Sequence, residues 1–534
     1  MGFSIGIRLC LVLLTLGTPW QVQGSISNTY ECFQSRPDIC APILDITHYE
    51  KGHVAPGFIF ITPYDLATCN DGPYIYNHLG ELVWYGAVDN EFVHNLHPCH
   101  IAGHDKLCML KMRHGEGVSA SGPVILFGLG LYTPEGERDF VEINVGVEPD
   151  MHELSVVNNS TAVITTWLAT KPWNLSSVGG PSTGYLRTAG FQEIDIKTQT
   201  VNFMWDPADH VEIEASQMEL CRKWGDGISL ETPWDYFHIN SVDKTKNGDY
   251  LISSRHTSTI YMISGQNGTV LWRLGGYKSD FTFESALNFS SQHHVQLREE
   301  NDQTMQISLF DNASDEWHET ASSSSGLMLH LDLETMHASL IRRYEMPHKI
   351  LTTREGSVQF LDNGNAFVYW GGTPFLSEHE HTPDGPRTVF QARLADPTGY
   401  WYRAWKADFR TAPATSPDVY AVAEYGAGPT VWFISWNGAT EVQGWRVYAS
   451  QQQWSGYELV GYFEKRGFET KIEWDGFFAW TVIEAVDMNG LRISHLSGPH
   501  STFVEGLHRD IGGQSVLSNY ALWSRDDKRF IQKP

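Results

Sequence analysis

Two histidines and one arginine in the middle of the chain have the types and spacing of a reactive polar site. His238 is followed two positions later by Asn240, and residues two apart in a strand face the same side. The returning strand brings Arg255 back near the level of His238, and His293 begins a later strand of the same kind. Imidazoles beside a guanidinium group can bind an anion and carry out nucleophilic or acid–base chemistry.

His152 and Arg354 are further candidates for the same site. When four strands are aligned on their valines, His152 shares the register of His238, and Arg354 falls at the same place. A lone histidine at a strand start is more often a hydrogen-bonded structural residue, and Arg354 also suits a solvated loop. Glu153, beside His152, is predicted to be a charge at a blade edge. The predicted catalytic residues are His238, His293 and Arg255, and the predicted substrate-binding residues are Asn240, Arg354 and His152.

A metal centre is the other chemistry that several histidines allow. Arg255 argues against it, because the guanidinium group would place positive charge beside a bound cation. No glycine-rich phosphate loop occurs in the sequence. We therefore predict neither a metal nor a cofactor.

Repeated sequence motifs predict the scaffold that brings these strands together. A short apolar strand, a turn and a strand ending in an aromatic residue recur, as in Ile75 to Trp84 and Ile260 to Trp272. Between them lies a second hairpin that begins in His or Ser, as in His238 to Arg255. Two alternating hairpins make a four-stranded blade, and repeated blades make a β-propeller. Equivalent blade positions converge on a central channel, so His152, His238 and His293 are expected around one pocket.

The length of 534 residues requires more than one core, and the pattern changes after the propeller. We predict an all-β chain with a signal peptide at 1–24, a β-propeller at 25–410, and a linker at 411–420 that contains two prolines. Short strands at turn-separated intervals then predict a β-sandwich of the fibronectin or immunoglobulin type at 421–498. Residues 499–534 are expected to form a polar tail.

The net charge of -26 narrows the classes of partner. Such a surface repels nucleic acid phosphates, so a nucleic-acid partner is not expected. An anionic substrate would need a local cationic pocket to enter, which makes the placement of each arginine informative. The sequence leaves the oligomeric state open.

The first 24 residues predict export. Arg8 precedes an apolar run that is too short for a membrane span, and small residues follow at the cleavage positions. No later segment is expected to cross a membrane, so the mature chain is predicted to be secreted. Removing this segment removes Cys10 and leaves six of the seven cysteines, which favours disulfides without fixing their pairing. Six sequons are predicted glycosylation sites: Asn158, Asn159, Asn174, Asn267, Asn288 and Asn312.

Several long sequence motifs around the candidate residues resemble those of the arylsulfotransferase family. They are His238-Ile-Asn-Ser-Val, Gly248 to Ile260, Leu271 to Gly276, Gln292-His293, Leu309 to Asn312, Gly356 to Asn365 and Trp370-Gly371. The resemblance extends over about residues 55 to 490 and is strongest to the fungal secreted branch, because Ser435-Trp-Asn-Gly-Ala-Thr-Glu-Val442 also occurs here. It implies a six-bladed propeller that moves a sulfuryl group from one phenol ester to another phenol, without a nucleotide sulfate donor.

The resemblance also implies roles for the site residues. In the bacterial branch the group passes through a sulfohistidine, and His238, His293 and Arg255 match that branch's supporting histidines and arginine. The bacterial nucleophile comes from a loop before the strand equivalent to Gly356 to Leu361, where the nearest histidine here is His348 at an altered spacing. The nucleophile is therefore missing, moved to His238 or His293, or replaced by direct transfer.

Three hypotheses follow. The first is a secreted sulfuryl-transfer enzyme acting on small phenolic compounds and aryl sulfates. The second is a non-catalytic secreted propeller that binds small anionic or aromatic ligands, which the missing loop histidine favours. The third is the same scaffold recruited to another reaction on an aromatic metabolite. Fold transfers more readily than activity, so all three stay open at this point.

Overall fold

The computed structural model describes residues 29–64, 66, 71–86, 91–113, 124–128, 140–143, 147–221, 223–285, 287–413, 415–426, 428–493 and 496–504. The predicted signal peptide and most of the predicted polar tail lie outside the described residues, as does Cys69. The chain divides into two compact units. One comprises Met1–Phe33, Pro37–Thr415 and Asn437–Thr440, and the other comprises Gln34–Arg36, Ser416–Trp436 and Glu441–Pro534.

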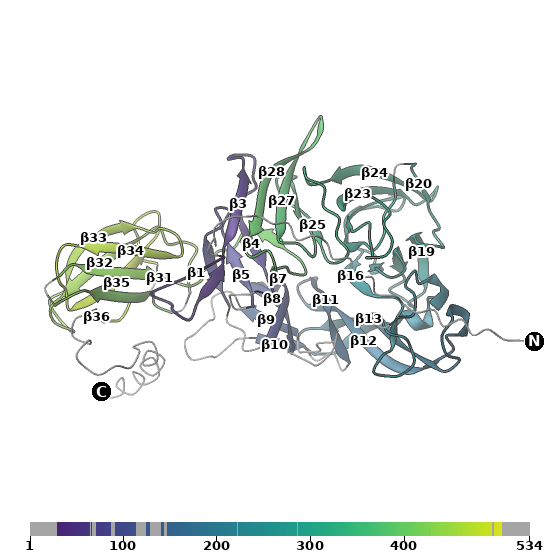
Figure 1. Ribbon diagram of the computed structural model, residues 1–534, viewed down its shortest axis with the longest axis horizontal. Helices are drawn as coiled ribbons and strands as arrows, with labels where there is room; N and C mark the ends of the chain where they lie inside the picture. The colour runs from purple at the N-terminus through teal and green to yellow at the C-terminus, as the bar shows by residue number, and fades with distance from the viewer. Residues whose placement is uncertain are drawn as a thin grey trace, which may run out of the picture. The chain divides into compact units, whose positions relative to one another are not determined.

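The first unit is all-β, and its described part has a propeller-like arrangement of five blades, each a sheet of four consecutive antiparallel strands (Figure 1). The blades are β7–β10, β11–β14, β16–β19, β21–β24 and β25–β28. Their bounds are β7 Glu91–Ile101, β8 His104–Arg113, β9 Val124–Gly128, β10 Phe140–Ile143, β11 Glu148–Val157, β12 Thr161–Trp173, β13 Gly184–Asp195, β14 Val201–Trp205, β16 Ile239–Lys244, β17 Tyr250–Ser254, β18 Thr259–Ile263, β19 Val270–Gly275, β21 His293–Glu300, β22 Thr304–Asp311, β23 Ser325–Asp332, β24 His337–Tyr344, β25 Ser357–Phe360, β26 Ala366–Tyr369, β27 Phe375–Thr382 and β28 Gly385–Leu394.

A further sheet joins the two ends of this unit. β4 (Phe58–Ile61), β5 (Tyr74–Tyr76) and β6 (Leu82–Tyr85) follow one another, and β29 (Trp405–Ala407) pairs antiparallel with β4. Short strands extend other sheets: β3 (Leu44–Tyr49) on β28, β15 (Trp234–Asp235) on β13, and β20 (Thr282–Phe283) on β24. β1 (Tyr30–Cys32) and β2 (Cys40–Pro42) form a separate pair.

Helices contribute little to the described residues. They are three single 3-10 turns, η1 (Ser176–Val178), η2 (Pro207–Asp209) and η3 (Ile213–Ala215). No helix in the described ranges is long and apolar enough to cross a membrane. The expectation of an all-β chain is therefore confirmed.

The second unit contains seven described strands. β30 (Asp418–Ala423), β31 (Thr430–Ser435) and β34 (Glu469–Trp474) pair with one another, as do β32 (Gly444–Ser450), β33 (Glu458–Glu464) and β35 (Trp480–Val486). β36 (His500–Val504) pairs with both β30 and β35. Trp432 and Trp445 are fully buried and donate their indole N–H groups to Thr481 and Thr470, at 2.7 and 3.0 Å.

The blades are held together around the axis by hydrogen bonds between their first strands. The backbone N–H of Val242 in β16 donates to Glu153 in β11 at 3.4 Å, and that of Val295 in β21 donates to Ser241 at 2.9 Å. The N–H of Val358 in β25 donates to Nδ1 of His294 at 3.1 Å. The same link therefore recurs from blade to blade, and its donors are three of the valines that align the repeats in the sequence.

Apolar side chains fill the spaces between neighbouring sheets. Phe191, Trp205, Tyr250 and Tyr261 lie in one buried cluster between the blades β11–β14 and β16–β19. Trp205 donates its indole N–H to the carbonyl of Gly268 at 2.9 Å. A second cluster between β16–β19 and β21–β24 is mainly aliphatic and includes Phe281 and Phe289. These blade interfaces position the first strands that carry the candidate site.

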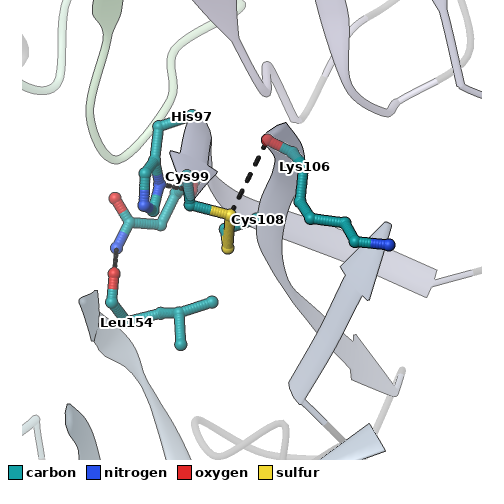
Figure 2. Close-up of a disulfide and its surroundings, with 6 residues drawn as sticks. His97, Cys99, Lys106, Cys108 and Leu154 are labelled. Atoms are coloured by element: carbon teal, nitrogen blue, oxygen red, sulfur yellow. Dashed lines mark hydrogen bonds between the residues drawn. A yellow bond between two sulfur atoms is a disulfide. The ribbon is translucent and has the colours of Figure 1, made fainter. Parts of the chain in front are cut away.

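Two disulfides join neighbouring strands. Cys99 and Cys108 connect β7 to β8, with His97 nearby (Figure 2), and Cys32 and Cys40 connect β1 to β2. The prediction of disulfides is thus confirmed for these four cysteines. Cys221, one of the six cysteines, is buried and carries a free thiol.

Burial separates the six sequon asparagines into two groups. Asn312 is fully buried, and its Nδ2 donates to Thr352 and to the carbonyl of Glu355, each at 3.1 Å. A glycan on that nitrogen has no room in the folded chain and would break both bonds, so we withdraw this predicted site. The other five are exposed: Asn158, Asn159, Asn174, Asn267 and Asn288.

A buried ion pair connects the last segment of the first unit to the middle blades. Arg403 donates from Nη1 to Glu153 at 2.9 Å and from Nη2 to the carbonyl of Asn240 at 2.6 Å, with side-chain exposures of 0% and 6% for the two charged residues. Tyr402 donates its hydroxyl to the same carbonyl at 3.0 Å. The prediction that Glu153 is a charge at a blade edge is therefore wrong.

Replacing Arg403 with Met should destabilise the first unit by about 3–5 kcal/mol, because Glu153 would keep its charge in a buried place without a partner. Arg403→Met combined with Glu153→Leu should recover part of this loss. Arg393→Ala is the matched control: its pair with Asp45 is half exposed, so removal should cost at most about 1 kcal/mol. Chemical unfolding followed by tryptophan fluorescence measures all three, and equal losses for Arg403→Met and Arg393→Ala would contradict the prediction.

Candidate functional site

Three histidines from successive blades meet around Tyr402. The ring centroids of His152 and His238 are 4.7 Å apart, and His152 lies 5.3 Å from the Tyr402 ring. His293 approaches the same tyrosine ring at 6.4 Å. The structure therefore brings together the three histidines that the blade repeats predict around one pocket.

His238 is held as a neutral imidazole with an available nitrogen. Its Nδ1 donates to Oδ2 of Asp235 at 2.5 Å, which fixes the tautomer and leaves Nε2 with a lone pair. Burial lowers the pKa of His238 below its ordinary value, although the Asp235 carboxylate acts in the opposite direction. The carboxylate would stabilise the positive charge that forms on the ring when Nε2 attacks an electrophile.

His152 has the same arrangement one blade earlier. Its Nδ1 donates to Oδ2 of Asp150 at 2.6 Å, so Nε2 is again the nitrogen with a lone pair. Only 6% of His152 and 9% of His238 is exposed. Two carboxylate-oriented imidazoles thus stand edge to face in a buried place.

His293 is oriented by neutral groups instead. Its Nδ1 donates to Oδ1 of Asn312 at 2.7 Å, and the carbonyl of Ser291 lies 3.1 Å away. Its Nε2 accepts the backbone N–H of Glu355 at 3.3 Å. Burial and then the nearby Arg255 hold the pKa of His293 well below its usual range. His293 is therefore a neutral ring whose second nitrogen already has a weak donor.

Arg255 is a buried cation with unused hydrogen-bond donors. It is 2% exposed, its Nη2 donates to the carbonyl of Thr353 at 2.7 Å, and its guanidinium carbon lies 5.0 Å from the Trp224 ring centre. Nε and Nη1 are buried and have no hydrogen-bond partner among the described residues. Burial lowers the pKa of Arg255 to about 10, so the group stays charged at neutral pH. Buried donors normally have acceptors, so this guanidinium edge is suited to an anionic ligand.

Arg354 and Asn240 lie differently from the core of the cluster. Arg354 is exposed, and its guanidinium carbon lies 4.5 Å over the Tyr400 ring. Asn240 is fully buried and donates from Nδ2 to the carbonyl of Gln292 at 2.7 Å, which ties β16 to the start of β21. The strand alternation on which the prediction for Asn240 rests is interrupted here, because the pairing register shifts between Ile239 and Ser241.

The structure adds residues that the sequence did not indicate. Asp150 and Asp235 orient two of the histidines, and each precedes its histidine by two or three positions, a spacing that could have been noticed. His94 is buried with an unpartnered Nδ1, and burial lowers its pKa to about 4. Glu355 and Tyr64 are hydrogen-bonded to each other near His293. A single loop glutamate carries no pattern from which that placement could be predicted.

One group of side chains could share a metal ion. Ligand atoms of Asp235, His238 and His256 all lie within 4.8 Å of one another. Nδ1 of His238 and Nδ1 of His256 already donate to the carboxylate and the carbonyl of Asp235, at 2.5 and 2.6 Å. An ion would have to displace these bonds and would stand near Arg255, which disfavours it electrostatically.

The described fold is that of an all-β, propeller-like protein with a buried cluster of imidazoles and one arginine. A model of the Arylsulfotransferase (ASST) family matches residues 131–391, a range that includes His152, His238, Arg255, His293 and Arg354. No curated protein matches the chain.

Solved structures resemble the chain only remotely. A Bacteroides caccae protein of unknown function has 13% identity and a TM-score of 0.38, covering 66% of this chain and 99% of its own. A Lactobacillus plantarum protein has 11% identity and a TM-score of 0.33, covering 79% and 100%. The GH43 protein BlXynB from Bacillus licheniformis has 9% identity and a TM-score of 0.24, covering 85% and 90%.

Inorganic sulfate should bind at Arg255 and change the fluorescence of Trp224, whose ring lies against the guanidinium group. Arg255→Ala should abolish the saturable change, and Arg255→Lys should keep only part of it, because an ammonium group lacks the two-pronged donor edge. Arg393→Ala, which removes the same charge from an exposed place, should bind as the wild type does. Equal sulfate affinity in Arg255→Ala would contradict an anion site at this position.

Proposed function

We propose that the chain is an arylsulfotransferase-like enzyme that moves a sulfuryl group between small phenols. The observation that carries the proposal is Arg255, a buried cation with two donors that have no partner in the described residues. It lies beside two neutral imidazoles, of which His238 has an available Nε2. The family match over residues 131–391 supports the same reaction class and aryl or phenolic substrates. Sulfate esters are anions, so a protein of net charge -26 needs such a local cation to admit them.

His238 is the nucleophile in this proposal. Its Nε2 attacks the sulfur of an aryl sulfate, the bond from sulfur to the phenolic oxygen breaks, and the electron pair leaves with that oxygen. Asp235 stabilises the cationic ring, and Arg255 donates to sulfuryl oxygens as their charge shifts. An acceptor phenol oxygen then bonds to sulfur and the nitrogen–sulfur electron pair returns to His238.

Two features favour His238 over His293 for this role. The Nδ1 of His238 donates to a carboxylate, whereas that of His293 donates to neutral groups. The Nε2 of His293 already accepts the Glu355 amide, so the ring is suited to positioning and to polarising a bound oxygen. His152 shares the carboxylate support and lies edge-on to His238, where it would contact the transferred group.

The finer architecture belongs to the same proposal. The sheet of β29 and β4–β6 would be a sixth blade that closes the propeller, because it joins the two ends of the first unit. The strands of the second unit would form the fibronectin- or immunoglobulin-like sandwich after a linker near residue 415. We also propose a secreted glycoprotein of the fungal branch. Its two disulfides and five exposed sequons suit that assignment.

A non-catalytic binding protein is the second candidate. His348, the nearest histidine to the position of the bacterial nucleophile, is exposed and packs on Phe375 at 5.5 Å. It therefore takes no part in the cluster around Tyr402. A chain without turnover that still binds aryl sulfates at Arg255 would fit this candidate.

The two candidates differ in an assay with a chromogenic aryl sulfate and a phenol acceptor. Wild type should release the chromophore and sulfate the acceptor, and His238→Ala should abolish both while binding of the aryl sulfate persists. Arg255→Ala should slow transfer by about 10² to 10³, the loss typical of one preorganised donor, and Arg255→Lys should recover part of it. His337→Ala, at an exposed position in β24, is the control and should be fully active.

A wild type that binds the aryl sulfate without turnover would favour the binding protein. Turnover in His238→Ala would instead move the nucleophile to His293 or His152, or indicate direct transfer.

A further inference from the structure

Sulfuryl transfer to a phenol also requires a group that takes the acceptor's proton. Neither His238 nor His293 supplies one, and His152 is placed against the transferred group in the proposed reaction. Nε2 of His238 is occupied by sulfur in the proposed intermediate, and Nε2 of His293 accepts a backbone N–H. A neutral phenol is a poor nucleophile until its proton moves, so a positioned base contributes to the rate.

A carboxyl group lies beside this cluster without a cation hydrogen-bonded to it. Tyr64 donates its hydroxyl to Oε1 of Glu355, and the N–H of Gly372 donates to Oε2 at 3.0 Å. The backbone N–H of the same glutamate donates to Nε2 of His293 at 3.3 Å, and its carboxyl group is close enough to His152 to interact with it electrostatically. Glu355 is 6% exposed, whereas Tyr64 is only partly buried and lies 5.2 Å from the His94 ring.

The backbone at Glu355 is held in a conformation that side chains rarely adopt. Its φ is 60°, in the left-handed region, and Gly356 follows at 106°. A Cβ at Gly371 would lie 2.3 Å from the carbonyl oxygen of Arg354, so only glycine allows this close approach. Strained residues that are fixed in this way cluster at functional sites, and here the strained residue carries the carboxyl group that accepts from Tyr64.

We propose that Tyr64 and Glu355 form the proton carrier of the transfer reaction, with the Tyr64 hydroxyl between the substrate oxygen and the carboxylate. This rests on the proposed function. In the acceptor step the substrate O–H proton passes to Tyr64 Oη while the Tyr64 proton passes to Glu355 Oε1. The freed oxygen pair bonds to sulfur, and the nitrogen–sulfur pair returns to His238. In the donor step the protons run backwards and neutralise the leaving phenolate.

The electrostatic surroundings allow both directions. Burial raises the pKa of Glu355 to about 7, although Arg354 and the Tyr64 hydrogen bond oppose the shift. The other titratable groups that interact with the carboxyl or contact Tyr64 include His152, Tyr369, Tyr400 and His94. A group that titrates near neutral pH can accept a proton in one step and donate it in the other.

The test separates the two half-reactions at single turnover. With unsubstituted phenyl sulfate, wild-type release of phenol should slow as pH rises through about 7, because the donor step needs protonated Glu355. Transfer to an acceptor phenol should accelerate over the same range. Glu355→Gln should lose both pH dependences and slow the acceptor step by about 10² to 10⁴, most for the least acidic phenols. Tyr64→Phe should have the same signature.

Controls exclude a general structural loss. Both variants should keep wild-type sulfate affinity and melting temperature, and release of a nitrophenol should be little affected because that leaving group needs no proton. Glu345→Gln and Tyr277→Phe, which change exposed residues of the same types, should behave as the wild type.

If the rate of the acceptor step in Glu355→Gln stays within about threefold of the wild-type rate at every pH, the proposed proton carrier is wrong. The proposed transferase activity would still stand. If neither the wild type nor Glu355→Gln transfers a sulfuryl group, both the proposed transferase activity and the proposed proton carrier are wrong.

Discussion

The buried pair between Glu153 and Arg403 is the interaction on which the site depends most. Glu153 accepts from Arg403 and from the backbone N–H of Val242, so one carboxylate connects the segment before β29 with the first strands of two middle blades. Taking both charges out of water costs free energy, and removing one partner leaves the other buried and unpaired. The pair therefore favours the one arrangement in which both charged groups meet. The pair also fixes the position of the neighbouring residue Tyr402. His152 and His293 both lie against the Tyr402 ring, so the arrangement of the histidines depends on this ring.

Charge balance around that ring sets which chemistry the imidazoles can perform. Burial and Arg255 keep His293 neutral, while Asp235 fixes the tautomer of His238 and opposes part of the fall in its pKa. A protonated ring has no lone pair for sulfur, so lowering the pKa preserves the nucleophile. The aspartate then supplies the negative charge that the attacked ring needs. In the proposed reaction, the cation that would attract a sulfate ester therefore also helps to keep the histidines neutral, and a cluster with more carboxylates would lose both properties.

Repeats in the sequence predict the all-β class, the blade arrangement and the meeting of His152, His238 and His293, because equivalent strands must occupy equivalent places around an axis. They fail where a strand departs from regular pairing. Alternation places Asn240 beside His238, but the bulge after Ile239 turns its amide toward the neighbouring strand. The burial of Asn312 could not be predicted either, because the sequon pattern is the same on a surface turn and in a core. Glu355 lies in a loop without periodicity, and its position follows from contacts with distant segments that no local pattern records.

Backbone strain connects the fold with the proposed chemistry. His238 and Glu355 both have positive φ, 54° and 60°, although neither is glycine. His238 directly precedes β16, and Glu355 lies two residues before β25. The left-handed conformation at Glu355 is accommodated by Gly371, whose lack of a Cβ lets two backbone segments meet. The blades thus supply stability through regular pairing, and the site arises where that pairing is interrupted.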